Sequence, residues 1–144
     1  MSKIIKRALK ILESRMTYES NIFSSPDDTK NYLRLKLGNK EREIFSVLYL
    51  SSQHQLISYE ELFLGTIDGA SIHVREIVKL GLSLNAAAIV CAHNHPSGIC
   101  EPSKADELIT QRIRDACELV DIRMLDHLIV SGKGSVSLAE RGLI

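Results

Sequence analysis

Two histidines and a later aspartate are the residues of this chain whose types and spacing could hold a metal ion. His93 and His95 stand one residue apart at the end of the apolar run 86–92, and Asp106 follows thirteen residues after His93. Side chains alternate faces along a β-strand, so both imidazoles are expected on the same side. A helix that begins near Ser103 would aim Asp106 back at the strand end.

This set of side chains matches the ligands of catalytic zinc. Two imidazoles, one carboxylate and a water make an open tetrahedral site. Nitrogen and oxygen ligands without thiolates suit zinc, although other divalent metals accept the same donors. The pattern therefore predicts a Zn²⁺ site with one position open for chemistry, and another divalent metal is the alternative.

Each part of the pattern also has a purely structural interpretation. A His-x-His pair at a strand end often only forms hydrogen bonds. Ser103 and Asp106 have the spacing of a capping box, in which a serine and an acidic residue three positions later bond each other's backbone N–H groups. Helix physics alone favours that interpretation for the pair. The conjunction of paired histidines, a turn and a carboxylate within fourteen residues favours a metal site.

Four segments have the apolar spacing of amphipathic helices. They are residues 3–15, Ser25 to Leu37, Val74 to Leu84, and Ser103 to Val120. Ser25 suits the N-cap of the second segment, and Gly38 is expected to end it. Leu108 and Ile113 are expected on the buried side of the last segment. Residues 16–24 are expected to form a connector.

Segments rich in β-forming residues predict a mixed sheet. They are residues 43–50 with a hairpin partner at 55–58, a third strand within 62–67, the run 86–92, and closing strands at 122–125, 128–130 and 136–138. The run 86–92 is apolar throughout, as in a strand buried on both faces. The expected fold class is α/β (α+β), with a mixed sheet flanked by helices.

Two further residues are expected to support this core. Cys91 shares strand parity with His93, and a buried thiol beneath the site is favoured over a metal ligand. His127 is expected between two of the closing strands, with a structural role or a contact to a metal ligand rather than ligation.

The composition is that of one ordinary globular domain. The chain has 144 residues, of which 44% are hydrophobic and 25% charged. Three cysteines without regular spacing disfavour a disulfide framework, and no apolar stretch is long enough to cross a bilayer. These features predict a reduced, cytoplasmic protein.

The charge balance disfavours general binding to nucleic acid. Eighteen basic residues offset eighteen acidic ones, whereas nucleic-acid binding usually depends on a basic surface. The best candidate for a local basic patch is the cluster Lys3, Lys6, Arg7 and Lys10. A solvated helix face is the favoured interpretation of that cluster.

The residues around the histidines resemble a known metalloprotease signature. The stretch from His93 to Asp106 reads His-x-His-Pro-Ser-Gly and then Pro-Ser-x-x-Asp, and it resembles the JAMM (MPN/JAB) motif of RadC-like proteins. The likeness continues in segments 75–78, 85–88, 125–127 and 135–142. It implies the layered architecture of MPN/JAB and cytidine-deaminase-like folds. We divide the chain accordingly into a helical segment with its connector, residues 1–24, and a RadC-like JAMM domain, residues 25–144.

The resemblance also implies an activity and the residues that carry it. His93, His95 and Asp106 would be the metal ligands, and Ser103 would lie beside the attacking water or the oxyanion. The implied reaction is the metal-dependent hydrolysis of a peptide or isopeptide bond.

A general base is the remaining requirement of the family. It is an upstream glutamate on an early strand, and Glu43 best fits that place. Glu41 and Glu76 are its rivals, and a solvated surface carboxylate is the favoured interpretation of Glu41.

The chain differs from the family pattern in two places. Full-length RadC-like proteins carry a helix-hairpin-helix region, whereas a short helical segment precedes the domain here. This difference removes the usual argument for DNA contact. The segment 73–76 has valine where many relatives have proline, which is expected to alter only a local turn.

A non-enzymatic function is the competing expectation. JAMM-like folds also serve as scaffolds, and RadC-like proteins have long carried a DNA-repair label. The chain could therefore be a metal-binding scaffold or a module that binds DNA or protein. The intact ligand set favours the enzyme, while the substrate and the oligomeric state stay open.

Overall fold

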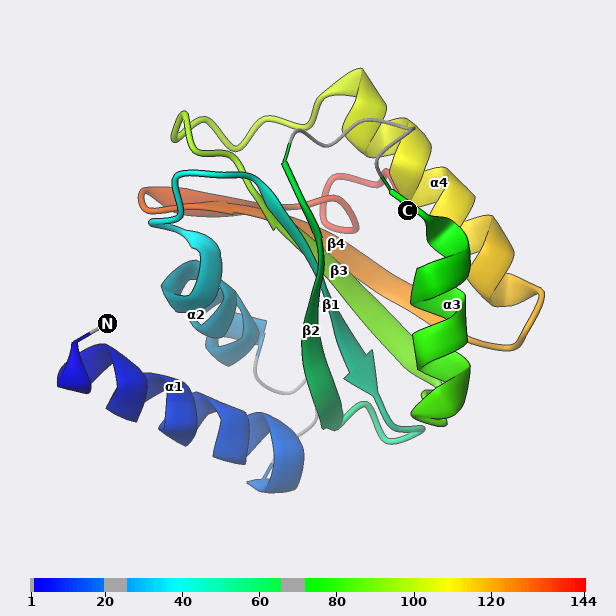
Figure 1. Ribbon diagram of the computed structural model, residues 1–144, viewed down its shortest axis with the longest axis horizontal. Coiled ribbons are helices and arrows are strands. Elements are labelled where there is room, and N and C mark those ends of the chain that lie inside the picture. The colour runs from blue at the N-terminus through cyan, green and yellow to red at the C-terminus, as the bar shows by residue number, and fades with distance from the viewer. Residues whose placement is uncertain (1, 20–25, 66–71) are drawn as a thin grey trace.

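A mixed sheet separates two pairs of helices in the computed structural model, which describes residues 2–19, 26–65 and 72–144 (Figure 1). Its helices are α1 (Lys3–Ser14), α2 (Pro26–Leu37), α3 (Val74–Ser83) and α4 (Lys104–Glu118), with a π-helical turn at Arg15–Glu19. Its strands are β1 (Ile44–Leu50), β2 (Leu56–Leu64), β3 (Ala88–Asn94), β4 (Arg123–Ser131) and β5 (Gly134–Ser137). The expected α/β class, with a mixed sheet flanked by helices, is confirmed.

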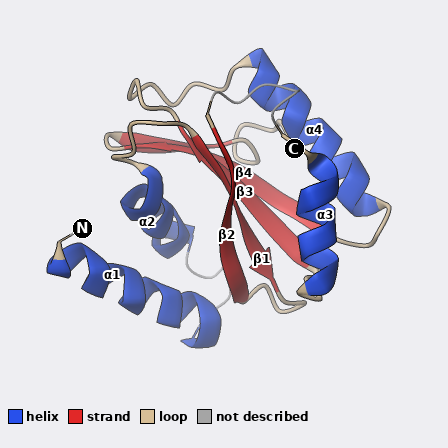
Figure 2. Cartoon of the chain, viewed as in Figure 1, coloured by secondary structure: helices blue, strands red, loops and turns tan. Residues whose placement is uncertain are grey.

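Strand β3 lies at the centre of the sheet, whose order is β2-β1-β3-β4-β5. It runs antiparallel to β1 and parallel to β4, while β2 and β5 are antiparallel edge strands. Every residue of β1 and of β3 is buried. Covering by helices on both faces explains why these strands are apolar almost throughout (Figure 2).

Alternation along β3 divides the core into two clusters. Ala88, Val90 and Ala92 pack toward α1 and α2, whereas Ile89 and Cys91 pack toward α3 and α4. The same alternation continues past the apolar run. It places the His93 side chain on the face of α4 and gives the residue after it the opposite face.

The second helix ends where the sequence predicts, and the reason is a close approach of two backbones. A Cβ atom at Gly38 would lie 2.5 Å from the carbonyl oxygen of Arg34 and 3.1 Å from that of Ser131. Glycine at this position therefore lets the chain leave α2 against the end of β4. The predicted N-cap, Ser25, lies outside the described residues.

Several expected boundaries are wrong. Residues 62–64 continue β2 rather than starting a third strand, and the closing strands expected at 122–125 and 128–130 are one strand, β4. His127 therefore lies within a strand and not between two. Residues 16–19 of the expected connector belong to the π-helical turn Arg15–Glu19.

The first helix packs its apolar side onto the domain. Leu9 and Leu12 are buried in the same cluster as α2, while Lys3, Lys6, Arg7 and Lys10 are exposed on the other side. The favoured interpretation of the basic cluster, a solvated helix face, agrees with this placement. The division of the chain at residue 24 stays a prediction. Among the described residues, the helices are too short or too polar to span a membrane.

The apolar face of α4 is narrower than its sequence suggests. Ile113 is completely buried, but Leu108 is 57% exposed, so the expectation that Leu108 faces the core is wrong. Leu108 directly precedes the buried Ile109 and therefore points about 100° away from it around the helix.

We expect Ile113→Ala to destabilise the fold by about 2–5 kcal/mol, because it removes buried methyl groups and leaves a cavity. Leu108→Ala on the same helix is the control, and its cost should stay within about 0.5 kcal/mol. Urea denaturation of both variants measures the difference. Equal losses would contradict the burial of Ile113 and the exposure of Leu108.

Candidate metal centre

The two histidines meet because the strand geometry of β3 continues past its last residue. The N–H of His95 donates to the carbonyl oxygen of Val130 at 3.0 Å, so His95 still pairs with β4. The Nε2 atoms of His93 and His95 lie 3.1 Å apart. The expectation that both imidazoles project to the same side is confirmed.

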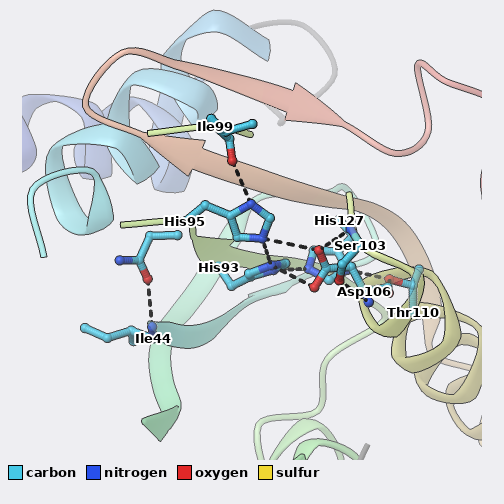
Figure 3. A network of polar contacts seen from close by, with 9 residues as sticks. Ile44, His93, His95, Ile99, Ser103, Asp106, Thr110 and His127 are labelled. Carbon is cyan, nitrogen blue, oxygen red and sulfur yellow. Dashed lines mark hydrogen bonds and ion pairs between the residues drawn. The ribbon is translucent and has the colours of Figure 1, made fainter. Parts of the chain in front are cut away.

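The carboxylate of Asp106 joins them from the start of α4 (Figure 3). Its Oδ1 lies 3.1 Å from Nε2 of His93, and its Oδ2 lies 3.2 Å from Nε2 of His95. One ligand atom from each of the three residues lies within 4.8 Å of the others. This group could hold a metal ion, and its two nitrogens and one carboxylate suit a divalent cation such as Zn²⁺.

The capping box predicted for α4 is present and aims Asp106. The N–H of Asp106 donates to Oγ of Ser103 at 3.0 Å, and the N–H of Ser103 donates to Oδ2 of Asp106 at 2.8 Å. The structural and the metal interpretations of this pair are therefore compatible. One carboxylate oxygen both caps the helix and faces His95, so helix formation itself orients the ligand.

The electrostatics of the group favour an ionised carboxylate. Burial by itself would raise the pKa of Asp106. The His93 and His95 rings, which donate to the carboxylate when they are protonated, and the N–H of Ser103 outweigh it and hold the pKa well below its usual range. The hydrogen bond to Asp106 is also the main cause that raises the pKa of His95, and the charge of Glu43 adds to it. The carboxylate thus draws a cation, either a proton or a metal, into the group.

A chain of hydrogen bonds behind His93 fixes which of its nitrogens carries hydrogen. The Thr110 hydroxyl donates to the carbonyl oxygen of Asp106 at 2.6 Å, so it accepts from Nδ1–H of His127 at 2.6 Å. Nε2 of His127 is then the acceptor for Nδ1–H of His93 at 2.7 Å. The Nε2 of His93 therefore presents a lone pair to the site, as a metal ligand must.

The surroundings of His127 are consistent with its neutral form. It is completely buried, and burial is the main cause that lowers its pKa well below the usual value. The ring of Phe45 lies against both imidazoles, with centroids 6.1 Å from His93 and 5.4 Å from His127. His127 therefore contacts the candidate ligand His93 and is not itself part of the group that could hold a metal, as expected.

His95 is fixed in the same tautomer by a separate contact. Its Nδ1–H donates to the carbonyl oxygen of Ile99 at 2.8 Å, which leaves Nε2 for the metal. The side chains of His93 and Asp106 are 0% and 2% exposed, whereas that of His95 is 15% exposed. The group is accordingly open to solvent on the His95 side, where a reactant could enter.

The three candidate bases occupy different places. Glu43 is half-buried directly before β1, and its charge acts on His95. Glu41 is exposed two residues earlier, and Glu76 is exposed in the first turn of α3. A groove beside the group is lined by Glu41, Arg42, Glu43, Gly65 and Pro96. Of the three carboxylates, Glu43 is the one whose charge contributes to the raised pKa of His95.

Two supporting residues are not found by the sequence reasoning. Thr110 lies one helical turn after Asp106, a spacing that could have pointed to a shared face of α4. Asn94 stands between the histidines and is completely buried. Its partners, the segment from Lys40 to Ile44, are about fifty residues away in the chain, so no local pattern reveals them. Cys91 is buried beneath the site, as expected, and burial raises the pKa of its thiol.

The fold and the site together define an α/β domain of the JAB/MPN type with a candidate metal centre. Residues 23–143 match the RadC-like JAB domain, and the chain belongs to that family. The resemblance seen in the sequence is thereby confirmed.

Several bacterial relatives are similar over most of the chain. A UPF0758 protein of Vibrio cholerae is 54% identical over 140 residues, which are 97% of this chain and 87% of the relative. A UPF0758 protein of Methylibium petroleiphilum is 49% identical over all 144 residues, which cover 64% of it. One of Cellvibrio japonicus is 57% identical over 122 residues, or 85% of this chain and 54% of the relative. The chain thus spans between half and two thirds of the length of the last two relatives.

We expect Thr110→Val to weaken zinc binding by about 10- to 100-fold, because it removes the acceptor that orients His127 and, through it, His93. Thr29→Val is the matched control, since Thr29 is also a buried helical threonine and its hydroxyl has no hydrogen-bond partner among the described residues. Competition with a chromogenic chelator measures both affinities. An affinity that is equal for Thr110→Val and the parent chain would contradict the tautomer assignment.

Zinc binding should weaken in acid. The raised pKa of His95 means that the metal-free group keeps a proton to a higher pH than a free imidazole, and zinc must displace it. The apparent affinity should therefore fall as pH drops below that pKa, by about tenfold per pH unit for each displaced proton, and level off above it. Chelator competition across about pH 5 to 9 tests this, with the chelator's own protonation subtracted. A flat profile would contradict the prediction.

Proposed function

We propose that this chain is a zinc-dependent hydrolase of peptide or isopeptide bonds. The observation that carries the proposal is the meeting of two imidazole lone pairs and one carboxylate at a solvent-open edge, with the charge of Glu43 beside them. Three protein ligands with one open side are typical of catalytic zinc, whereas structural zinc sites are closed by four.

The ligand roles follow from the hydrogen bonds. His93 and His95 would each give Nε2, because their Nδ1–H groups are held by His127 and by the Ile99 carbonyl. Asp106 would give its carboxylate. Zinc supplies a Lewis acid that polarises the scissile carbonyl and makes a water acidic enough to react near neutral pH.

The remaining steps belong to two side chains of the protein. Glu43 would accept a proton from the attacking water and pass it to the departing amine. The Ser103 hydroxyl uses an oxygen lone pair for the N–H of Asp106, so its hydrogen can be donated. Directed at the substrate, this donor would stabilise the carbonyl oxygen as it gains negative charge.

The groove beside Glu43 supports a polymeric substrate. It lies between the segment before β1 and Pro96, the residue after His95. An extended peptide in this groove would pass beside Glu43 and Pro96, the residue that follows His95. The proposal therefore concerns an amide within a chain rather than a small free amide.

We expect Glu43→Gln to keep zinc and to lower kcat by about 10²- to 10⁴-fold, because glutamine cannot accept the proton. Glu76→Gln, which changes an exposed carboxylate in the first turn of α3 and outside the groove, should leave the rate unchanged. His95→Ala should lose the metal itself. The assay uses the zinc-loaded chain with a library of quenched fluorescent peptides that includes isopeptide-linked lysines.

The outcomes separate the enzyme from the scaffold. Full turnover by Glu43→Gln would move the base elsewhere, and unchanged zinc stoichiometry in His95→Ala would refute the ligand set. If the zinc-loaded parent chain cleaves no member of the library, while binding zinc through these ligands, the proposal fails in favour of a non-catalytic metal-binding domain.

A further inference from the structure

Asn94 is a completely buried polar residue at the last position of β3, between the two histidines. The alternation of side chains along the strand gives it the opposite face from His93. It therefore cannot join the ligand group. Both the oxygen and the nitrogen of its carboxamide nevertheless form hydrogen bonds, which indicates a different role.

The carboxamide binds the backbone on both sides of Glu43. Its Oδ1 accepts a hydrogen bond from the N–H of Ile44 at 2.7 Å. Figure 3 labels Ile44 and marks this hydrogen bond with a dashed line. The Nδ2 of Asn94 donates to the carbonyl oxygen of Arg42 at 2.9 Å and, more weakly, to that of Lys40 at 3.4 Å. The N–H of Gly65 donates to the carbonyl oxygen of Glu43 at 2.9 Å from the other side. The peptide units next to Glu43 are thus held by side chain and backbone together.

A primary carboxamide suits this position because it offers a donor and an acceptor on one short, planar group. An aspartate would keep the acceptor but lose the donor, and would set a buried charge against two carbonyl oxygens. A serine hydroxyl is too short to reach both Ile44 and Arg42. Without Asn94 the buried N–H of Ile44 would lose its partner, which is costly at the start of a central strand.

We propose that Asn94 is a positioning residue that holds Glu43 beside the metal ligands, and this inference rests on the role given to Glu43 in the proposed function. The strand end that carries His93 and His95 also carries, on its other face, the anchor for the base. The distance between base and ligands is thereby set within a single stretch of β3. Displacement of a base by about 1 Å can lower a rate by about a hundredfold.

The first test needs zinc alone and no substrate. In Asn94→Ser, hydrogen exchange of the Ile44 amide should accelerate by about tenfold or more, because its buried acceptor is lost. Zinc affinity should stay within about threefold of that of the parent chain, because the ligands and the residues that orient them are unchanged. If the serine variant does not fold, Asn94→Leu takes its place, because leucine has nearly the same shape as asparagine and also lacks an acceptor for the Ile44 N–H.

The matched control is Tyr49→Phe. Tyr49 lies on β1, and its buried hydroxyl donates to the carbonyl oxygen of Ile77 at 2.8 Å, far from the site. Its loss should reduce stability without changing exchange at Ile44 or the zinc affinity. Unchanged exchange at Ile44 in Asn94→Ser, or a fall of more than about tenfold in zinc affinity, would overturn the proposal, since Asn94 would then not hold this segment or would act on the ligands.

The second test is a double-mutant cycle with the library peptide that the parent chain cleaves fastest. Asn94→Ser should lower kcat by about tenfold to a hundredfold with little change in KM, yet add no further loss in a Glu43→Gln background. If the double variant loses the product of the two single-variant factors in kcat, Asn94 acts independently of Glu43 and the proposal is wrong. If the parent chain cleaves no peptide, the proposed function fails, while the exchange and zinc measurements still decide whether Asn94 holds the segment.

Discussion

Three electron-rich groups facing one another across a space of less than 5 Å form the constraint on which the rest of this structure depends. The Nε2 atoms of His93 and His95 and the carboxylate of Asp106 would repel one another if nothing positive lay between them. Their repulsion is relieved only by a proton or a cation. Each group must therefore be held in place by contacts on its far side, and those contacts account for much of the local fold.

The contacts come from different elements and reach the group from different directions. The capping box at the start of α4 orients Asp106, the Thr110–His127 pair orients His93, and the carbonyl of Ile99 orients His95. Thr110 donates to the carbonyl of Asp106 itself, so the support of one ligand is tied to the backbone of another. Substitutions at Thr110 and His127 should accordingly be non-additive.

The sequence shows the part of this arrangement that is local. The meeting of the three side chains could be predicted because strand parity aligns His93 with His95 and because a capping box starts the helix that carries Asp106. The expectation that Leu108 faces the core is wrong because apolar spacing alone does not show how much of a helix the sheet covers. The interruption expected between two closing strands before Leu128 is absent. Strand β4 continues there because the side chains of Asp126 and His127 both form hydrogen bonds.

Asp126 forms its hydrogen bonds partly with residues more than ten positions away, which no local sequence pattern reveals. Oδ2 of Asp126 accepts the hydroxyl of Ser137 on β5, and Oδ1 accepts the N–H groups of His127 and Ala139. The position of Glu43 also depends on contacts that are distant in the sequence, and its role as the base is implied largely by family resemblance. The residue that holds its segment, Asn94, is separated from it by the hairpin, α3 and most of β3.

The burial of these polar side chains also bears on why they are kept. His93, Asn94, Asp106 and His127 are all between 0% and 2% exposed, and a buried polar network is often no more stable than an apolar core of the same shape. Stability alone would therefore allow Leu or Phe at several of these positions. Their hydrogen bonds instead leave the Nε2 lone pairs of His93 and His95 directed at one point and fix the backbone around Glu43. These hydrogen bonds orient the Nε2 lone pairs and add little to the stability of the core. Lone pairs that point at one place are what a metal centre requires.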